Sequence, residues 1–162
     1  MKTIISTIAL SLVINFAWAQ KVKEAEVPAA VKDAFAKKYA GAKAEKWEKE
    51  NSDYEAEFDW NKTEASALFA SDGTFKELEE EIKTSSLPAG VAEYCKKNYA
   101  GWKLEEASKI ADAAGKISYE AEMKKGKEHF DAIFDDKGNF VKKGDVEKGD
   151  EGKDEDDKKG KK

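Results

Sequence analysis

The stretch KKYAGAK at residues 37–43 returns as KKNYAGWK at residues 96–103, and this repetition determines how the chain is organised. An offset of 60 residues relates the two Tyr-Ala-Gly turns. Downstream the offset becomes 65, which aligns DYEAEF at 53–58 with SYEAEM at 118–123. The five extra residues of the second copy fall around 111–115, and we expect them to lengthen a surface loop, where insertions are tolerated. The body of the chain is therefore a duplicated unit.

Each copy opens with the pattern of an amphipathic helix. Pro28 and Pro88 suit the first helical position, where proline gives up a donor that would be unpaired anyway. Gly41 and Gly101 provide the left-handed residue that ends such a helix. Between them, apolar side chains recur at helical spacing in both copies: Val31, Ala34, Phe35 and Tyr39, then Val91, Tyr94, Cys95 and Tyr99.

After the helix, the hydrophobic period changes from 3.6 residues to 2. In YEAEFDW at 54–60 the apolar side chains take one face and the acidic side chains take the other. Turn signals such as Asn61-Lys62 and Asp72-Gly73 separate further segments of this kind. The predicted strands of the first copy are Lys43–Glu50, Asp53–Trp60, Glu64–Ser71 and Thr74–Ile82. The second copy repeats the pattern and includes a strand at 127–135.

The predicted fold class is α+β, with two tandem copies of one helix plus a four-stranded antiparallel meander, and with the helices covering one face of the sheet. One copy alone is small for a stable core, so we expect a single body. Two arrangements stay open, because the sheets can align edge to edge or the copies can share a core.

The first 19 residues have the pattern of a signal peptide. Lys2 precedes an apolar run at 4–16, and Ala17 and Ala19 form a cleavage motif, so we predict cleavage after Ala19. The run is shorter than the roughly 20 apolar residues that a membrane span needs. The expected location is therefore periplasmic or secreted.

The rest of the chain divides by composition. The C-terminal tail, residues 144–162, contains no aromatic residue and one aliphatic residue, Val146. It therefore buries too little apolar surface to become ordered. A calcium-binding role for DEDD at 154–157 is the alternative, although no glycine-punctuated acidic loop is present. The predicted segments are a signal peptide at 1–19, a first repeat at 20–82, a linker at 83–86, a second repeat at 87–143 and a disordered charged tail at 144–162.

The net charge limits the kinds of molecule that the protein can bind. Removing residues 1–19 takes away one lysine and no acid, which leaves 28 basic and 34 acidic residues and a formal charge of −6. All the basic residues are lysines. This balance argues against nucleic acid as a partner, because phosphate binding needs a net basic face. The single cysteine, Cys95, excludes an intramolecular disulfide, and its place on the apolar helix face predicts a buried thiol.

The order of these motifs resembles a known family. A proline-opened amphipathic helix, Tyr-x-Gly-x-Lys, a Tyr-Glu-x-Glu-Phe strand and an Asp-Gly-x-Phe hairpin are similar to the PepSY-like, beta-lactamase-inhibitor-protein-like domain of exported proteins from Bacteroidota-type bacteria. The resemblance covers Val27 to Lys143 in two tandem copies. Members usually carry proline in the turn where this chain has Ala40 and Ala100. The resemblance implies a helix-plus-sheet architecture whose concave sheet clasps an enzyme, although a fold alone does not carry a function.

The sequence argues against catalysis, a bound metal and a cofactor. It has one histidine and one cysteine, no Gly-x-Ser-x-Gly motif, no phosphate loop and no His or Cys pair at metal-ligand spacing. The pairs Glu55/Glu57 and Glu120/Glu122 offer carboxylates for acid and base chemistry. Their alternation along a strand instead predicts ordinary solvent-facing residues.

The outward sheet face is the predicted contact surface. We expect its acidic residues and two apolar ones to bind a basic or amphipathic protein or peptide of the cell envelope. The predicted partner-binding residues are Glu55, Glu57, Asp59, Leu68, Glu120, Glu122, His129, Asp131 and Ile133. Plain solvation of these acids is the simpler alternative. A third hypothesis is a small-ligand or divalent-cation-binding envelope protein that uses the outward acids together with His129, or the acidic tail.

Two tryptophans differ between the copies. Trp47 aligns with Ala107, and Trp102 aligns with Ala42. We expect both tryptophans to pack in the core or at the junction between copies, with contact anchors as the alternative.

Overall fold

The computed structural model describes residues 20–148 as an α+β protein built on one antiparallel sheet. The predicted signal peptide, and the tail beyond residue 148, lie outside the described residues. The helices are α1 (Ala29–Lys38) and α2 (Val91–Asn98), with short 3₁₀ turns at Glu24–Glu26 and Thr84–Ser86. The strands are β1 (Gln20–Val22), β2 (Lys46–Glu50), β3 (Asp53–Trp60), β4 (Thr63–Ala70), β5 (Phe75–Glu81), β6 (Lys103–Asp112), β7 (Ile117–Lys125), β8 (Glu128–Asp135), β9 (Phe140–Lys143) and β10 (Glu147–Lys148).

The sheet has ten strands, rather than the eight that two four-stranded units would give. Its order follows the chain from β1 to β8, and both β9 and β10 pair with β8. The two unpredicted strands are β1 and β10, which lie at the edges. The prediction of disorder from residue 144 is therefore wrong for Glu147 and Lys148, because the free edge of β8 pairs with their backbone.

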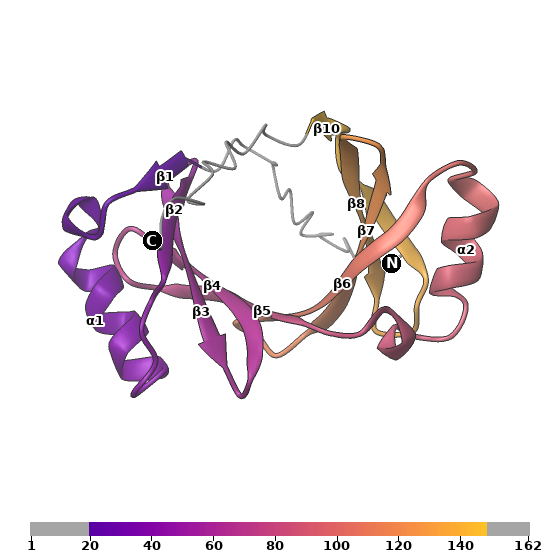
Figure 1. Cartoon of the computed structure of the whole chain (residues 1–162). Helices are drawn as coiled ribbons and strands as arrows, with labels where there is room; N and C mark the ends of the chain where they lie inside the picture. Colours follow the sequence, from indigo (N-terminus) through magenta and orange to yellow (C-terminus); the bar gives the residue numbers. More distant parts are fainter. Residues whose placement is uncertain (1–19, 149–162) are drawn as a thin grey trace, which may run out of the picture.

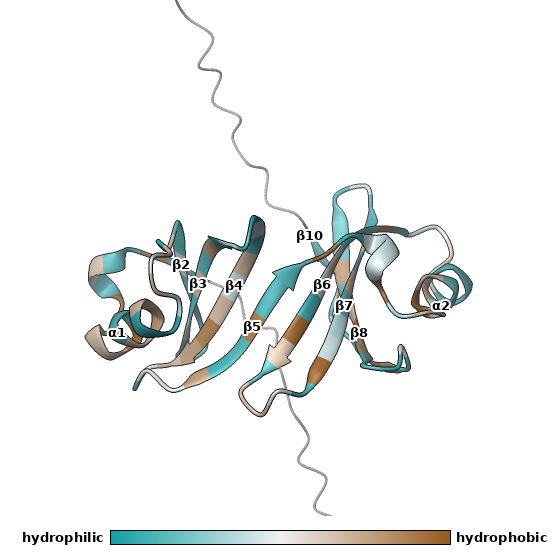
Figure 2. Ribbon diagram, turned by 90° about the horizontal axis from the view of Figure 1, so that it is seen from below, coloured by the Kyte–Doolittle hydropathy of each residue, from teal (hydrophilic) through white to brown (hydrophobic). Residues whose placement is uncertain are grey.

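The two copies meet edge to edge through β5 and β6. Five residue pairs form this antiparallel joint, from Glu77 opposite Asp112 to Glu81 opposite Ser108. Figure 2 shows β5 and β6 side by side in the middle of the sheet, with α1 and α2 at its opposite ends. The strand that follows the second helix therefore continues the sheet of the first copy.

The additional residues of the second copy extend this joint. The loop is longer, as expected, because residues 113–116 connect β6 to β7 where residues 51–52 connect β2 to β3. In addition, β6 has ten residues where β2 has five. The strand continues to Asp112, whose N–H donates to the carbonyl of Lys116 at 3.1 Å to close the turn. The insertion thus lengthens the strand that pairs with β5.

Each helix covers its own part of the sheet and its own core. In the first copy Val31 and Phe35 of α1 pack on the inward side chains of β3 and β4. In the second copy Val91 and Cys95 of α2 pack on those of β7 and β8. The sheet bends between the two cores so that both helices lie outside and the opposite sheet surface lines a concavity (Figure 1). The edge-to-edge arrangement, with separate cores, is the one observed.

The helix beginnings differ from the prediction. Pro28 directly precedes α1 as its N-cap. Pro88 lies three residues before α2, and the N-cap of α2 is Gly90, which has a φ of 92°. The carbonyls of both prolines still accept the N–H three residues later, at 3.1 Å from Val31 and 3.2 Å from Val91. Each proline therefore lies just outside its helix, and its carbonyl accepts a hydrogen bond from the first turn.

Both tryptophans are core residues of their own copies. Trp47 is buried and packs edge-on against Phe35, with ring centroids 5.6 Å apart. Trp102 is half-buried and packs against Phe130 at 4.6 Å. Within residues 20–148 no helix is both long and apolar enough to cross a membrane.

Candidate functional site

The candidate site is the concave face, which we define as the sheet surface opposite the helices. Its side chains alternate along the strands with those of the two cores. Strand register places many acidic residues on it, among them Glu48, Glu50, Asp53, Glu55, Glu57, Glu77, Glu79, Glu81, Glu106, Glu120, Glu122 and Asp131. This face therefore concentrates negative charge contributed by both copies.

Seven of the predicted contact residues lie together on the concave face. Glu55 is opposite Leu68 across β3 and β4, and Glu120 is opposite Ile133 across β7 and β8. Glu57 and Glu122 follow two positions further along β3 and β7, with Asp131 opposite Glu122. The structure brings these side chains together, and their role in binding a partner stays a prediction.

The other two predicted contact residues lie at strand ends. Asp59 is exposed and pairs with Glu64 near the end of β3. His129 pairs with Lys124 near the start of β8, and its Nε2 lies 3.9 Å from Glu147 Oε2 in β10. Neither is central to the concave face.

The concave face is less exposed than alternation alone predicted. Glu55, Glu57, Glu120 and Glu122 are half-buried rather than fully solvent-facing, because the bend of the sheet crowds the side chains on its concave side. Ile133 is only 5% exposed. Of the two predicted apolar members, Ile133 is therefore buried and Leu68 is half-buried.

Sequence reasoning missed the acidic residues at the joint. Glu77, Glu79 and Glu81 of β5 alternate with Leu78 and Glu80, so the period of 2 already places them on one face. Their position opposite β6 depends on which strands pair across the two copies, and local periodicity does not show this. Glu106 of β6 was missed for the same reason.

A groove of about 360 Å³ lies across this joint. Six of the residues that line it are glutamates from both copies: Glu55, Glu57, Glu64, Glu79, Glu81 and Glu106. The hydroxyl-bearing residues Ser66 and Ser108 also line it. The groove is therefore strongly acidic and is shared by the two copies.

Burial and mutual repulsion disfavour the ionised forms of these carboxylates. Burial, together with repulsion from Glu55, raises the pKa of Glu79 to about 7, although the Ser108 hydroxyl opposes the shift. Burial also raises the pKa of Glu120 well above its ordinary value, with repulsion from Glu79 as the next cause. The pKa of Glu50 is raised to about 7, first by burial and then by Glu55. The face thus holds carboxylates that a nearby cation would stabilise.

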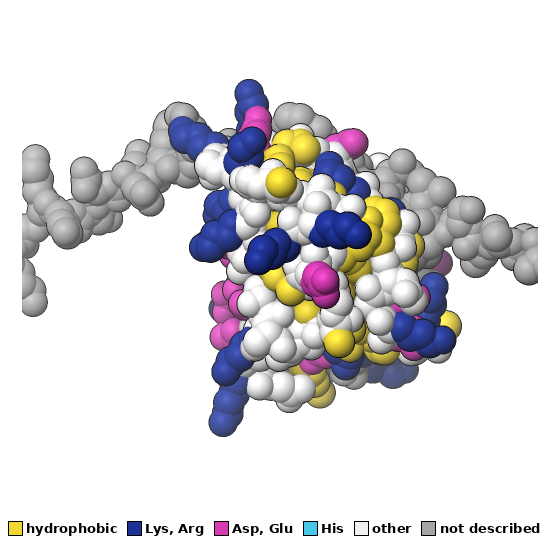
Figure 3. All heavy atoms as spheres, turned by 90° about the vertical axis from the view of Figure 1, so that its right-hand side faces the viewer, with side chains coloured by type: hydrophobic (Ala, Val, Ile, Leu, Met, Phe, Trp, Pro, Cys, Tyr) yellow, Lys and Arg dark blue, Asp and Glu magenta, His cyan; other side chains and the backbone are white. Residues whose placement is uncertain are grey.

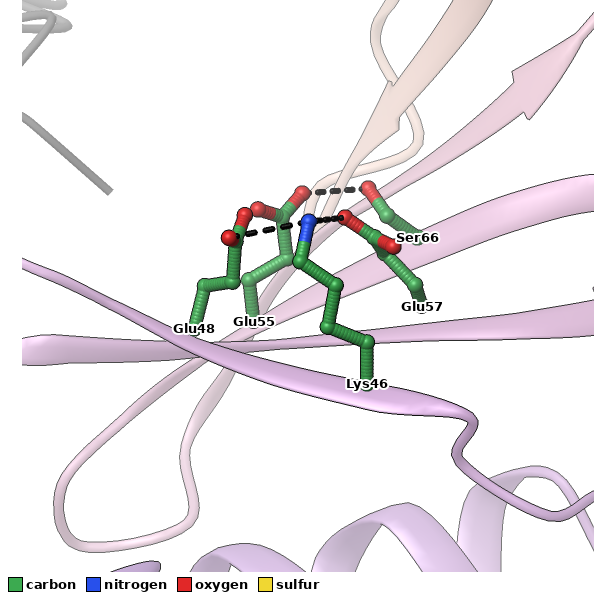
Figure 4. Close-up of polar contacts among 5 residues, drawn as sticks. All are labelled: Lys46, Glu48, Glu55, Glu57 and Ser66. Atoms are coloured by element: carbon green, nitrogen blue, oxygen red, sulfur yellow. Dashed lines mark hydrogen bonds and ion pairs between the residues drawn. The ribbon is translucent and has the colours of Figure 1, made fainter. Parts of the chain in front are cut away.

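Lysines from the chain itself already pair with part of this face. The Lys46 ammonium lies 2.9 Å from Glu48 Oε1 and 2.7 Å from Glu57 Oε1 (Figure 4). Beside this pair, the Ser66 hydroxyl donates to Glu55 Oε1 at 2.5 Å. Lys76 forms a further ion pair with Asp53.

A second, smaller pocket on the same face is lined mainly by the second copy and combines apolar and charged side chains. Its volume is about 100 Å³. Ile110, Ile133 and Val141 line it together with Ser118 and five charged residues: Glu77, Asp112, Lys116, Asp135 and Lys142. Ile110 and Ile133 are both 5% exposed. A partner that fills this pocket would gain apolar contact close to the acidic groove.

The described residues offer little for metal or thiol chemistry. Within residues 20–148 no group of three His, Cys, Asp or Glu side chains is arranged to hold a metal ion. Cys95 is buried in the second core, and this burial raises the pKa of its thiol to about 11. A thiol of this kind is poorly suited to nucleophilic chemistry near neutral pH.

The outer face of the second copy has a different character. Figure 3 shows lysine side chains spread over this side, with apolar atoms between them and few acidic groups. Lys96 and Lys97 of α2 are among its exposed residues. This side of the second copy therefore differs in charge from the concave face.

Comparison with known proteins agrees with this architecture. A family model described as PepSY-like and beta-lactamase-inhibitor-like matches residues 16–66 and 60–142, which together span most of the chain. The chain belongs to the PepSY-like family. No curated protein matches the sequence of this PepSY-like chain.

Solved structures share the PepSY-like fold at low sequence identity. A DUF2874 family protein from Bacteroides uniformis matches with a TM-score of 0.61 and 18% identity, covering 72% of this chain and 87% of that one. A BLIP-like protein from Bacteroides fragilis matches with a TM-score of 0.57 and 23% identity, covering 76% and 90%. A protein from Bacteroides eggerthii that is described as periplasmic matches with a TM-score of 0.59 and 17% identity, covering 72% and 87%. These likenesses establish the fold.

Proposed function

We propose that this PepSY-like protein is a non-catalytic, exported binding module that clasps a basic protein or peptide of the cell envelope in its concave face. The observation that carries the proposal is the groove of about 360 Å³ at the joint, lined by six glutamates from both copies. A ligand with positive charge would relieve the repulsion among these carboxylates. The smaller pocket at Ile110 and Ile133, rimmed by charged residues, adds a site for a side chain of the same partner that has an apolar stem.

The cellular location belongs to the same proposal. The signal-peptide pattern of residues 1–19 supports export with cleavage after Ala19, to the periplasm or the cell exterior. The description of the Bacteroides eggerthii relative as periplasmic agrees with this location. The BLIP-like description of the Bacteroides fragilis relative supports an inhibitor-like mode, in which the bound partner is occluded by the concave face.

The alternative of a divalent-cation-binding protein has less support. His129 is half-buried near Glu147, and the described residues provide no three-ligand arrangement for a metal. We therefore favour a protein or peptide partner over a metal ion.

Charge reversal on the concave face tests the proposal. The variant Glu57→Lys/Glu122→Lys reverses one acid in each copy, and Asp33→Lys/Glu93→Lys makes the same change in net charge on the exposed surfaces of the two helices. Each purified protein is cross-linked in extract of the native cell envelope, and the captured proteins are identified by mass spectrometry. We expect a basic partner that is captured by the wild type and by the helix variant and is lost from the face variant.

Two results would contradict this function. One is capture of no partner by the wild-type protein under conditions where cross-linking of a control complex succeeds. The other is a partner that the face variant retains and the helix variant loses, which would place the contact surface on the outer side of the sheet.

A further inference from the structure

The first copy shows how the concave face holds an ammonium group. Lys46 extends over the sheet, and its Nζ lies 2.7 Å from Glu57 on the neighbouring strand and 2.9 Å from Glu48 on its own strand (Figure 4). Burial alone would lower the pKa of Lys46, but hydrogen bonds to Glu57 and Glu48 outweigh it and raise the pKa. The face therefore stabilises a primary ammonium at this position.

The same position recurs in the second copy without its lysine. In the first copy Lys46, Glu57 and Ser66 stand opposite one another across β2, β3 and β4. The equivalent row across β6, β7 and β8 consists of Glu106, Glu122 and Asp131, which we call the acidic row. A carboxylate thus replaces the ammonium, and a second carboxylate replaces the serine hydroxyl.

The acidic row places like charges directly opposite one another, which destabilises a sheet. Burial, followed by repulsion from Glu122, raises the pKa of Asp131 to about 6. Burial, followed by repulsion from Glu106, raises the pKa of Glu122. His129 opposes both shifts, and Lys124 opposes the shift at Glu122, so the strand ends compensate part of the repulsion.

We propose that the acidic row binds an ammonium group supplied from outside, on the side chain of a lysine in the partner, at the position that Lys46 fills in the first copy. This inference rests on the proposed function and names the chemical group that the partner presents. A lysine suits the site because its compact ammonium carries three donors on a flexible stem. Glu106 also lines the groove at the joint, so the groove leads a partner segment to the row.

The two ammonium positions give the inference a matched set of variants. Glu106→Lys supplies the second copy with its own equivalent of Lys46 and so fills the proposed site. Lys46→Gln removes the native ammonium from the first copy and so opens the equivalent site there. Glu93→Lys makes the same charge change as Glu106→Lys on the exposed surface of α2 and serves as the control.

The probe is the peptide acetyl-(Lys-Ser)₃-amide, with the (Gln-Ser)₃ peptide as its neutral match. Binding to the full chain is followed by two-dimensional NMR at pH 7.5 and low ionic strength, where electrostatic contacts are least screened. In the wild type we expect saturable shifts centred on the backbone amides of residues 106, 122 and 131, and none with the neutral peptide. Glu106→Lys weakens binding at least tenfold, whereas Glu93→Lys changes it less than twofold.

The remaining outcomes distinguish a specific site from general attraction. Lys46→Gln should add a second set of shifts around residues 46 and 57, so that two peptides bind in place of one. The inference is wrong if the shifts spread evenly over the concave face, or if Glu106→Lys and Glu93→Lys weaken binding equally. A thermal melt of each variant confirms folding, and we expect Glu106→Lys to melt no lower than the wild type because it removes a like-charge contact.

The two proposals fail separately. If the envelope partner is lost on reversal of Glu57 and Glu122 but is unaffected by Glu106→Lys, the concave face is the contact surface and the acidic row is not the lysine site.

Discussion

The two copies share a backbone plan and fill their cores with different side chains. In the first, Phe35 packs edge-on against Phe58 at 4.9 Å and against Trp47 at 5.6 Å, which makes a core of aromatic rings. In the second, the equivalent positions hold Cys95, Met123 and Ala107, which are smaller or more flexible. The sheet and its turns are therefore compatible with two quite different core volumes.

The second copy compensates for only part of the missing volume. Trp102 packs on Phe130, and Leu104 replaces the smaller Ala44 of the first copy. A pocket of about 210 Å³ stays open beside α2 and is lined by Cys95, Tyr99 and Trp102, among others. The two copies therefore retain the same strand pairing although the side chains that fill their cores differ.

The largest expected loss of stability comes from truncating the core side chain at position 35, and the equivalent position 95 provides the comparison. Phe35→Ala removes a ring that contacts four aromatic neighbours, so it should lower the free energy of unfolding by about 3 to 5 kcal/mol. Cys95→Ala at the equivalent place removes only a thiol and should cost about 1 kcal/mol. Urea unfolding followed by circular dichroism measures both values. Equal costs would show that the two cores are packed alike.

A smaller effect compares equivalent glycines in the hairpins after β4 and β8. Gly73 has a φ of 87°, and a Cβ there would lie 2.5 Å from the carbonyl oxygen of Ala30 in α1. Gly138 has a φ of 81°, but its Cβ would lie 3.1 Å from the nearest atoms. We expect Gly73→Ala to cost about 3 kcal/mol, from left-handed strain plus the close contact, and Gly138→Ala to cost less.

The control for this comparison is Gly41, which also has a positive φ but has open space around its missing Cβ. Gly41→Ala should cost about 1 kcal/mol, from the backbone conformation alone. If all three variants lose the same stability in thermal melts, the approach of α1 to the hairpin at Gly73 is not tight.

The smallest effect is a gain in stability at the joint between the copies. Because the folded pKa of Glu79 is raised to about 7 from an ordinary value near 4.5, the native state holds an extra proton between these values. The contribution of Glu79 to the unfolding free energy should therefore be fully present below pH 4.5 and should be lost as the pH rises through about 7. Glu79→Gln should flatten this fall and should stabilise the protein by about 1 to 3 kcal/mol at pH 8.

The control is Glu81→Gln, which neutralises an exposed carboxylate two positions along the same strand. Urea titrations at pH 4.5 and pH 8 should give the control the same pH dependence as the wild type. A Glu79→Gln variant that loses stability at pH 8 would contradict repulsion at the joint.

Local patterns predicted the individual elements well. The strand expected at Asp53–Trp60 has these bounds in the structure, because strict alternation of apolar and acidic residues defines both its faces and its ends. Val31, Phe35 and Cys95 are core residues as expected from helical spacing. These features depend on neighbours in the sequence, so the sequence alone indicates them.

Long-range pairing accounts for what could not be predicted. The joint of β5 with β6 depends on a choice among several strand edges, and nothing near Glu79 or Glu106 indicates that choice. The strands β1 and β10 are three and two residues long, too short to show a period. The half-burial of the concave face follows from the bend of the sheet, which is a property of all ten strands together.

The joint between β5 and β6 also affects which side chains can be substituted without altering the shape of the molecule. Backbone hydrogen bonds between β5 and β6 hold the two copies at a fixed angle, and such bonds do not depend on which side chains the strands carry. The side chains of the concave face belong to neither core cluster, so most of them can be exchanged at little cost in stability. The shape of the concavity is in this sense independent of its chemistry. One rigid frame can therefore be fitted to a new partner by surface substitutions alone.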